Sequence, residues 1–164
     1  MAKYNFKGKE IRNGEDMKKI LKRCCWWLDI NEKIFRLYLK ANKCKQKNYN
    51  RRANYYYYKL YKRYDCFISP SAKIKSKINF PHPLGIVIGG GVEIGKNVTI
   101  YQNVTLGRKY KDKWEYPIIE DNVTIYCNAT IIGNVKIGKN AVIGCNSIVL
   151  RDVRENETVS GVVK

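Results

Sequence analysis

From Ile68 onward the sequence repeats aliphatic residues every six positions, and this period constrains the fold more than any other feature of the chain. An α-helix turns every 3.6 residues and cannot hold every sixth residue on one face. A flat amphipathic strand simply alternates, with no glycine at every sixth residue. Short strands joined by tight corners do fit the period. The repeated positions are Ile68, Ile74, Phe80, Ile86, Val92, Val98 and Val104, and then, after residue 118, Val123, Ala129, Val135, Ala141, Ser147, Val153 and Val159.

A second aliphatic position follows the first by two residues, for example at Ile88, Ile94 and Ile100, and glycines follow this second position at Gly89 and Gly95. Glycine and asparagine are the residues that tight corners favour, because both tolerate a positive φ. Three short strands with three corners make a triangular coil, and stacked coils bury a continuous aliphatic column. The pattern therefore predicts a hexapeptide-repeat parallel β-helix, an all-β solenoid.

The repeat is interrupted once, between Val104 and Val123, which are 19 residues apart. The intervening segment 107–117 is charged and aromatic and lacks the period. Insertions in a solenoid lie in loops, and loops on a rigid scaffold often carry function. We expect residues 107–117 to form a functional loop that protrudes from the coil. The alternative is a protruding loop without a function.

The first part of the chain follows a helical pattern instead. Apolar residues recur at three- and four-residue steps in Glu15–Leu28 and again from Ile34 to Ala41, and a third stretch, Arg51–Tyr64, is rich in tyrosine and lysine. The sequence therefore predicts a basic, tyrosine-rich helical segment at 1–66 and a β-helix domain at 67–164.

The net charge of +18 is concentrated in that first part, where residues 1–66 hold 19 Lys and Arg against 6 Asp and Glu. This concentration of positive charge attracts polyanions. The tyrosines could stack on nucleic-acid bases or lie at a membrane interface. The alternative is a helix that packs its tyrosine rings on the following β-helix domain and exposes its cations to water. Because the start of the chain has no apolar signal-peptide core and no run long enough to span a bilayer, we expect a cytoplasmic protein, with peripheral contact at the inner membrane face left open.

Metal chemistry is not expected. The six cysteines form no C-x-x-C pair, and His82 is the single histidine of the chain.

The motifs around His82 resemble one family. They are His82-Pro-Leu-Gly-Ile-Val-Ile-Gly89, then Val98-Thr-Ile-Tyr-Gln-Asn-Val-Thr-Leu-Gly107, a loop ending at Pro117, and Ala129-Thr-Ile-Ile-Gly-Asn-Val-Lys-Ile-Gly138. The pattern resembles the serine acetyltransferase branch of the hexapeptide acyltransferases, which includes capsule and surface-polysaccharide O-acetyltransferases. The resemblance covers roughly residues 66–161. It implies a left-handed β-helix, a homotrimer with active sites between subunits, and acetyl-CoA as co-substrate.

His82 matches the catalytic histidine of that family. A hydroxyl that attacks a thioester must lose its proton, and a neutral imidazole is the usual base. The alternative is a buried structural histidine, because His82 shares the phase of Ile88 and Ile94. The resemblance places the coenzyme along Cys127 and Cys145, with Gly107 at the root of the loop, and the acceptor at Pro81, Gln102, Asn103, Glu115 and Tyr116. Arg108, Lys109, Lys136 and Lys139 are candidates for binding the coenzyme phosphates, with simply solvated cations as the alternative.

Several positions depart from the serine-specific pattern. Pro81 stands where the branch has an aspartate, Phe67 stands where a second aspartate orients the histidine, and Glu115-Tyr116 replace an Arg-His pair. Without these contacts, an enzyme would distinguish serine only weakly from other hydroxyl acceptors. We therefore expect acetyl transfer to a sugar or surface-polysaccharide hydroxyl, with serine O-acetyltransferase of cysteine biosynthesis as the alternative. A non-catalytic β-helix that binds nucleic acid or membrane is a third reading, which the presence of His82 and the loop disfavours.

Overall fold

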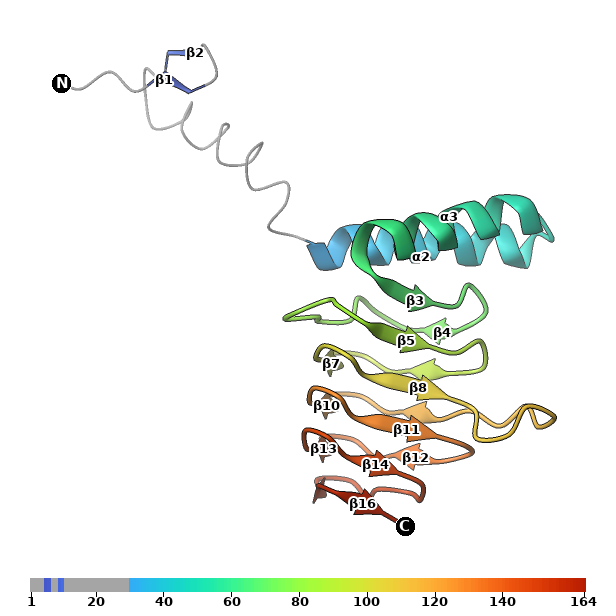
Figure 1. Cartoon of the computed structure of the whole chain (residues 1–164), viewed down its shortest axis with the longest axis vertical. Helices are drawn as coiled ribbons and strands as arrows, with labels where there is room; N and C mark the ends of the chain where they lie inside the picture. Colours follow the sequence, from blue (N-terminus) through green and yellow to red (C-terminus); the bar gives the residue numbers. More distant parts are fainter. Residues whose placement is uncertain (1–4, 7–8, 11–29) are drawn as a thin grey trace. The chain divides into compact units, whose positions relative to one another are not determined.

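Figure 1 shows the computed structural model of the chain, which describes residues 5–6, 9–10 and 30–164. The chain divides into two compact units, Met1–Ile30 and Asn31–Lys164. In the first unit, β1 (Asn5–Phe6) pairs antiparallel with β2 (Lys9–Glu10). The helix predicted at Glu15–Leu28 lies outside the described residues.

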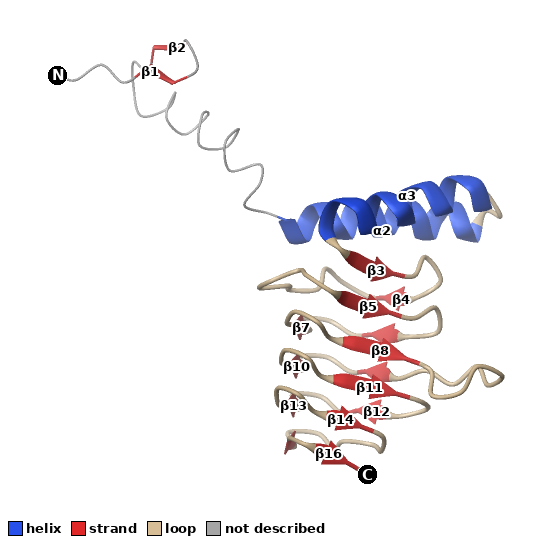
Figure 2. Ribbon diagram, viewed as in Figure 1, coloured by secondary structure: helices blue, strands red, loops and turns tan. Residues whose placement is uncertain are grey.

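The repeat forms a stack of triangular coils with three parallel sheets as its faces (Figures 1 and 2). The six-stranded sheet contains β3 (Cys66–Ile68), β5 (Ile86–Ile88), β8 (Thr105–Gly107), β11 (Thr130–Ile132), β14 (Ile148–Val149) and β16 (Val162–Val163). The second sheet contains β4 (Lys73–Ile74), β6 (Glu93–Ile94), β9 (Ile118–Ile119) and β12 (Lys136–Ile137). The third contains β7 (Thr99–Ile100), β10 (Thr124–Ile125), β13 (Val142–Ile143) and β15 (Thr158–Val159). The predicted left-handed β-helix is confirmed.

Equivalent hexapeptide positions stack directly on one another, as the pairing of Ile125 with Ile143 and of Ile131 with Val149 shows. Both aliphatic phases of the repeat point inward, so that Val98, Ile100 and Val104 are all fully buried. The interior is thus an aliphatic column whose burial supplies the main stabilising free energy. Ser147 is the buried polar residue of the described chain, and its hydroxyl donates to the Gly144 carbonyl at 2.7 Å.

Asparagines make the corners of the coil. Asn97, Asn122, Asn140 and Asn156 all have φ between 54° and 62°, and their side-chain amides bond to one another from coil to coil. Asparagine tolerates this left-handed backbone better than most residues because its short amide bonds locally. These stacked asparagines form a ladder along the corner. Each of them both turns the backbone and joins its coil to the next one.

Two helices, α2 (Ile30–Gln46) and α3 (Asn50–Tyr64), lie side by side across the first coil (Figure 2). Their buried faces, which include Ile34 and Leu60, cover the end of the aliphatic column. The predicted helical stretches at 34–41 and 51–64 are confirmed. Among the described helices, none is long and apolar enough to cross a membrane.

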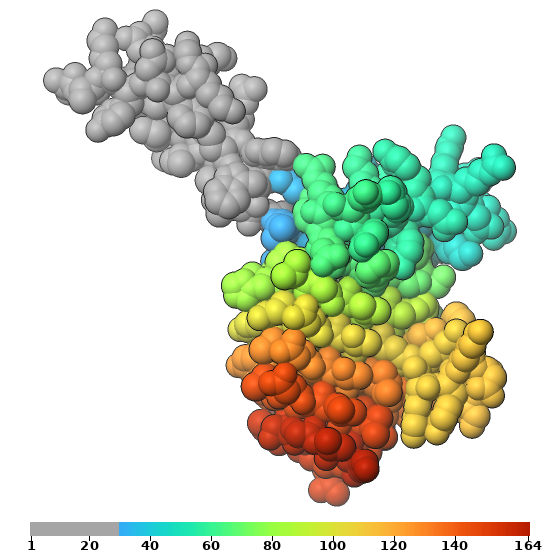
Figure 3. Space-filling model, in the orientation of Figure 1, coloured from blue at the N-terminus to red at the C-terminus, as the bar shows by residue number. Residues whose placement is uncertain are grey.

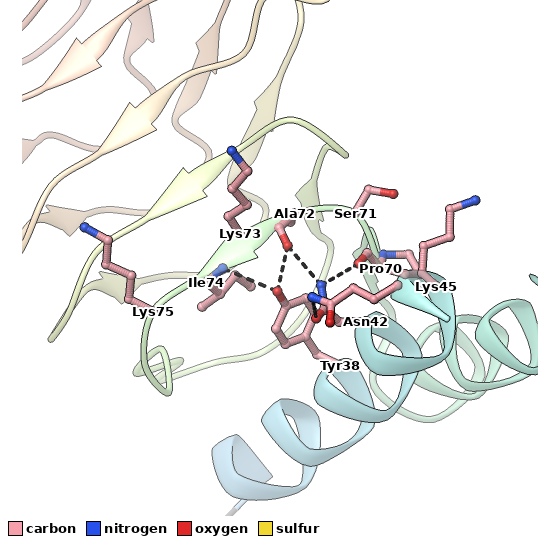
Figure 4. A pocket seen from close by; sticks show the side chains of 10 residues that line it. Tyr38, Asn42, Lys45, Pro70, Ser71, Ala72, Lys73, Ile74 and Lys75 are labelled. Carbon is pink, nitrogen blue, oxygen red and sulfur yellow. Dashed lines mark hydrogen bonds between the residues drawn. The ribbon is translucent and has the colours of Figure 1, made fainter. Parts of the chain in front are cut away.

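Polar side chains of α2 bond the backbone of the first coil (Figure 4). The Tyr38 hydroxyl donates to the Ala72 carbonyl at 2.7 Å and accepts from the Ile74 amide at 3.3 Å. Burial raises the pKa of Tyr38, so this phenol stays protonated as a donor. The Asn42 side chain donates to the Pro70 carbonyl at 2.8 Å. These bonds satisfy backbone groups that a solenoid end would otherwise leave without a partner coil.

Candidate active site

His82 lies in the loop between the isolated bridge at Asn79 and strand β5, at the corner where the coil passes from the third sheet to the six-stranded sheet. We call this corner, in all coils, the His82 edge. The alternative of a buried structural histidine is wrong, because the His82 side chain is exposed. Phe80 takes the inward position instead, with 3% of its surface exposed. Pro81 and Pro83 break the regular hexad after it, which turns the imidazole outward.

Backbone bonds to the coils on both sides hold this loop. Gly85 has a φ of 64° and donates its amide to the Asp65 carbonyl at 3.0 Å. The amide of Asn103, in the next coil, donates to the Leu84 carbonyl at 2.8 Å. His82 is therefore exposed on a backbone that is fixed in place, as a catalytic base requires.

A row of aromatic rings continues from His82 along the same edge. The His82 ring centroid lies 6.5 Å from that of Tyr101, and Tyr101 stacks on Tyr126 at 5.0 Å with an interplanar angle of 21°. These two tyrosines form a wall beside the imidazole that sequence reasoning did not single out. The sequence could have identified these two tyrosines, because they place a bulky ring at corner positions where other repeats have glycine, as at Gly144.

Four other predicted residues share the His82 edge, in successive coils: Gln102, Asn103, Cys127 and Cys145. Asn103 belongs to a corner ladder, in which its amide donates to Asn128 Oδ1 at 3.1 Å. Gln102 differs, because its Oε1 is buried and has no hydrogen-bond partner within the described part of the chain. A buried acceptor without a partner is costly, so a donor from a substrate or another subunit would be favoured there.

Loop 107–117 lies at a different corner. It leaves the coil after β8 and returns at β9, where the six-stranded sheet passes to the second sheet. In Figure 1 this loop and the His82 loop extend to opposite sides of the stack, and Figure 3 shows the loop as a yellow lobe. Within one protomer the β5 and β8 strands separate the two loops. The predicted contacts Pro81 and His82 are therefore not brought together with Arg108, Glu115 and Tyr116 in one subunit.

The loop is anchored through its own aromatic residues. The Tyr116 ring packs on the turn Gly89–Gly91, where a Cβ on Gly91 would overlap the ring, and Trp114 meets Tyr116 edge-on at 5.0 Å. Trp114 nevertheless keeps 70% of its surface exposed. Gly107, at the root of the loop, has open space beside it, since the nearest atom to a Cβ there would be Ile132 Cγ2 at 4.0 Å. A rigidly rooted loop with an exposed tip is suited to contact a second molecule.

Lys136 and Lys139 lie on and next to the second sheet, away from the His82 edge, and Lys136 pairs in register with Ile118, the first residue after the loop. Lys136 Nζ donates to Glu120 Oε1 at 2.8 Å, and this hydrogen bond to the carboxylate raises the pKa of Lys136. The same bond lowers the pKa of Glu120, whose other oxygen accepts from the Lys139 amide at 3.0 Å. Lys136 thus already has an intramolecular partner for its charge.

Asp65 is a carboxylate that sequence reasoning missed at this edge. It ends α3 in the left-handed conformation, with a φ of 50°, and its carbonyl binds Gly85 in the His82 loop. Aligning the motif linearly points to Phe67 for an acidic residue, but Phe67 packs its ring against Tyr61 of α3 at 4.3 Å. Only the coil geometry shows that an acidic residue two positions earlier lies at the His82 edge, where its backbone carbonyl accepts from the Gly85 amide.

A pocket of about 450 Å³ lies between α2 and the first coil, lined by Tyr38, Asn42 and Lys45 among others (Figure 4). His82 is not among its lining residues.

Near this end of the stack, burial raises the pKa of the Cys66 thiol to about 11, so Cys66 is no nucleophile. Among the described residues, no group of three or more His, Cys, Asp or Glu side chains could hold a metal ion.

Residues 116–151 match the family model described as bacterial transferase hexapeptide (six repeats). A serine acetyltransferase of Bacillus licheniformis is 45% identical over 96 residues, which are 58% of this chain and 44% of that protein. A soybean serine acetyltransferase complexed with serine superposes with a TM-score of 0.77 at 32% identity, over 82% of this chain and 56% of the other. A serine acetyltransferase complex with CoA gives a TM-score of 0.74 at 35% identity, over 78% and 53%. The chain thus spans about half the length of these proteins.

These relatives overturn the expected acceptor. Proteins named serine acetyltransferase match 58% of this chain in sequence and 78–79% of it in structure, so the prediction of a sugar or surface-polysaccharide acceptor is wrong, and the serine alternative fits better. The error had a physical cause. Replacing an Arg-His pair by Glu115-Tyr116 shows which contacts are missing from one loop, but other groups can bind an ammonium and a carboxylate.

Proposed function

We propose that this protein is an acetyl-CoA-dependent serine O-acetyltransferase in which His82 is the general base. The observation that carries the proposal is the exposed His82 imidazole on a backbone clamped by Asp65 and Asn103. The names of the relatives support the choice of serine as acceptor.

The chemistry assigned to His82 is a proton relay. The neutral imidazole accepts the hydroxyl proton of serine as the oxygen attacks the thioester carbonyl. When the carbon–sulfur bond breaks, the imidazolium returns the proton to the departing thiolate. The products are O-acetylserine and CoA. Transfer is direct, since no cysteine of the described chain is placed by motif as an acyl carrier.

We place the site between two subunits of a homotrimer. His82 and loop 107–117 lie at different corners of one coil stack, so a complete site needs the His82 edge of one protomer and the loop of its neighbour. Gly107 leaves open space at the root of the loop, and Arg108 and Lys109 follow it with exposed cations that suit phosphate or carboxylate groups. Cys127 and Cys145 continue the His82 edge as relatively small side chains along which the coenzyme would lie.

The test is steady-state acetyl transfer with L-serine and acetyl-CoA, followed by thiol release and product mass. We expect His82→Ala to lower kcat by about 10²–10⁴-fold, the range of general-base catalysis, with an unchanged melting temperature because the ring is exposed. Lys96→Ala, at another corner, is the matched control. Parent-like turnover by His82→Ala would remove His82 from the mechanism, and failure of the parent to acetylate serine would remove the acceptor.

The Asp65→Asn variant tests whether the Asp65 side chain takes part in catalysis or in serine binding. If it stabilises the imidazolium of His82, kcat falls and its pH profile shifts. If it binds the serine ammonium, KM for serine rises at constant kcat. Unchanged values for both exclude Asp65 from the site.

A further inference from the structure

The outer face of α3 carries a regular stripe of tyrosines and cations that acetyl transfer does not use. Ala53 and Leu60 bury the inner face of this helix, and Tyr61 packs on Phe67. The opposite face presents Arg51, Tyr55, Tyr58 and Lys62, spaced by four, three and four residues, which is one side of a helix. We call these four residues the α3 stripe. Tyr55 is 58% exposed and Tyr58 is 55% exposed, which is unusual for rings on a packed helix.

The charge around the stripe is almost entirely positive. Residues 30–64 contain eleven Lys and Arg and a single acidic residue, Glu32. Glu32 pairs with Arg36 at 2.7 Å and with Lys77 at 3.9 Å, and α3 itself has no acidic residue. The surface therefore attracts anions, and a second copy of the same surface would be repelled.

Each exposed ring is already covered by a cation of its own helix. Lys59 Nζ lies 5.7 Å from the Tyr55 ring centroid, and Lys62 Nζ lies 5.8 Å from that of Tyr58. A nucleic-acid base would have to displace these cations to stack, and a convex helix offers no groove to follow a strand. A phenol with an adjacent cation instead suits the boundary between lipid headgroups and water, where tyrosine rings are enriched and lysines meet phosphates.

We infer that the α3 stripe is a docking surface for an anionic lipid bilayer. The helix lies in the plane of the membrane, with Tyr55 and Tyr58 at headgroup depth and Arg51, Arg52 and Lys62 against the lipid phosphates. Because α2 and α3 cover one end of the coil stack, the stripe can lie on a flat surface without burying the His82 edge (Figure 2). A cyclic trimer turns the same end of every protomer to one side, so that three stripes bind together and avidity strengthens the contact.

The experiment is co-sedimentation of the full chain with vesicles of phosphatidylcholine alone or with about 30 mol% phosphatidylserine. We expect binding only to the anionic vesicles, reversed by high salt. The variant Arg51→Gln/Arg52→Gln/Lys62→Gln should bind at least tenfold more weakly, since each cation near such a surface contributes roughly fivefold. Lys75→Gln/Lys96→Gln/Arg154→Gln removes the same charge from the coils and should bind like the parent. Tyr55→Ser/Tyr58→Ser should weaken binding while leaving the net charge unchanged.

Three results would overturn the inference. Equal loss for the stripe and control triples would mean that net charge alone attracts the vesicles. Tighter binding of a single-stranded oligonucleotide, lost in the tyrosine variant, would assign the stripe to nucleic acid. Self-association of the parent that the stripe variants abolish would assign it to a second copy. Acetyl transfer without vesicles should be the same for parent and stripe variants, so the result is independent of the proposed function.

Discussion

Phe80 and His82 show how a single residue position can separate core from site. Both lie in hexad phases that point inward elsewhere in the chain, yet Phe80 is buried and His82 is exposed. The difference comes from Pro81, Pro83 and the positive φ of Gly85, which replace a regular strand by a loop. Within that loop, Gly85 takes a left-handed backbone and lies directly against the Asn103 side chain.

Gly85→Ala should therefore cost about 2–3 kcal/mol of unfolding free energy, measured by urea denaturation. A Cβ at this left-handed backbone is strained and would also overlap Asn103 Oδ1. Gly161→Ala is the control, because Gly161 has a φ of 76° with nothing within 4 Å of the added carbon. It should cost about 1 kcal/mol, from the backbone alone. Equal costs for the two variants would show that the contact with Asn103 is unimportant.

At the scale of elements, the coil corners hold the stack in register as much as the strands do. Each strand has two or three residues, far too few to pair stably by itself. The asparagine ladders add side-chain bonds between coils at the points where strand pairing ends. Register therefore depends on the corners and on the aliphatic column together.

Asn122 lies in the middle of one ladder and tests this role. Its Oδ1 accepts from Asn97 at 3.3 Å, and its amide donates to Asn140 at 3.1 Å. Asn122→Gly keeps the positive φ and loses only the bonds, so we expect a loss of about 1 kcal/mol. Asn122→Ala adds backbone strain and should lose about 2 kcal/mol. Thermal unfolding followed by circular dichroism checks the order, and an alanine variant as stable as the glycine variant would contradict it.

At the scale of the whole molecule, one subunit holds the two halves of the proposed site at different corners. A mixed trimer distinguishes a shared site from a site within one subunit. The His82→Ala chain and a chain with residues 109–114 replaced by Gly-Gly should each be inactive alone. When the two are co-expressed in equal amounts, about a quarter of the sites should combine an intact His82 with an intact loop. Recovery of roughly that fraction of parental turnover, measured on the whole purified trimer population including the homotrimers, is the expected result.

The mixture would stay inactive if both halves acted within one protomer. Mixing the two chains after separate purification, without subunit exchange, is the control for contaminating activity.

The sequence alone predicted the β-helix and the protruding loop, because a six-residue period admits few other structures and charged residues interrupt it once. Its helical pattern predicted the two described helices, and the family resemblance implied the left hand of the β-helix. It also singled out His82. What it did not determine was how residues far apart in the chain meet around the coil. The tertiary structure placed Asp65, Tyr101 and Tyr126 on the His82 edge, set Lys136 and Lys139 apart from it, and separated the loop from the histidine. The physical reason is that a periodic core fixes which side chains point inward through local steric and hydrophobic rules, whereas corner neighbours depend on the number of residues in each turn of the coil. The same limit explains the mistaken acceptor, since missing contacts in a linear motif do not show what the folded edge supplies instead.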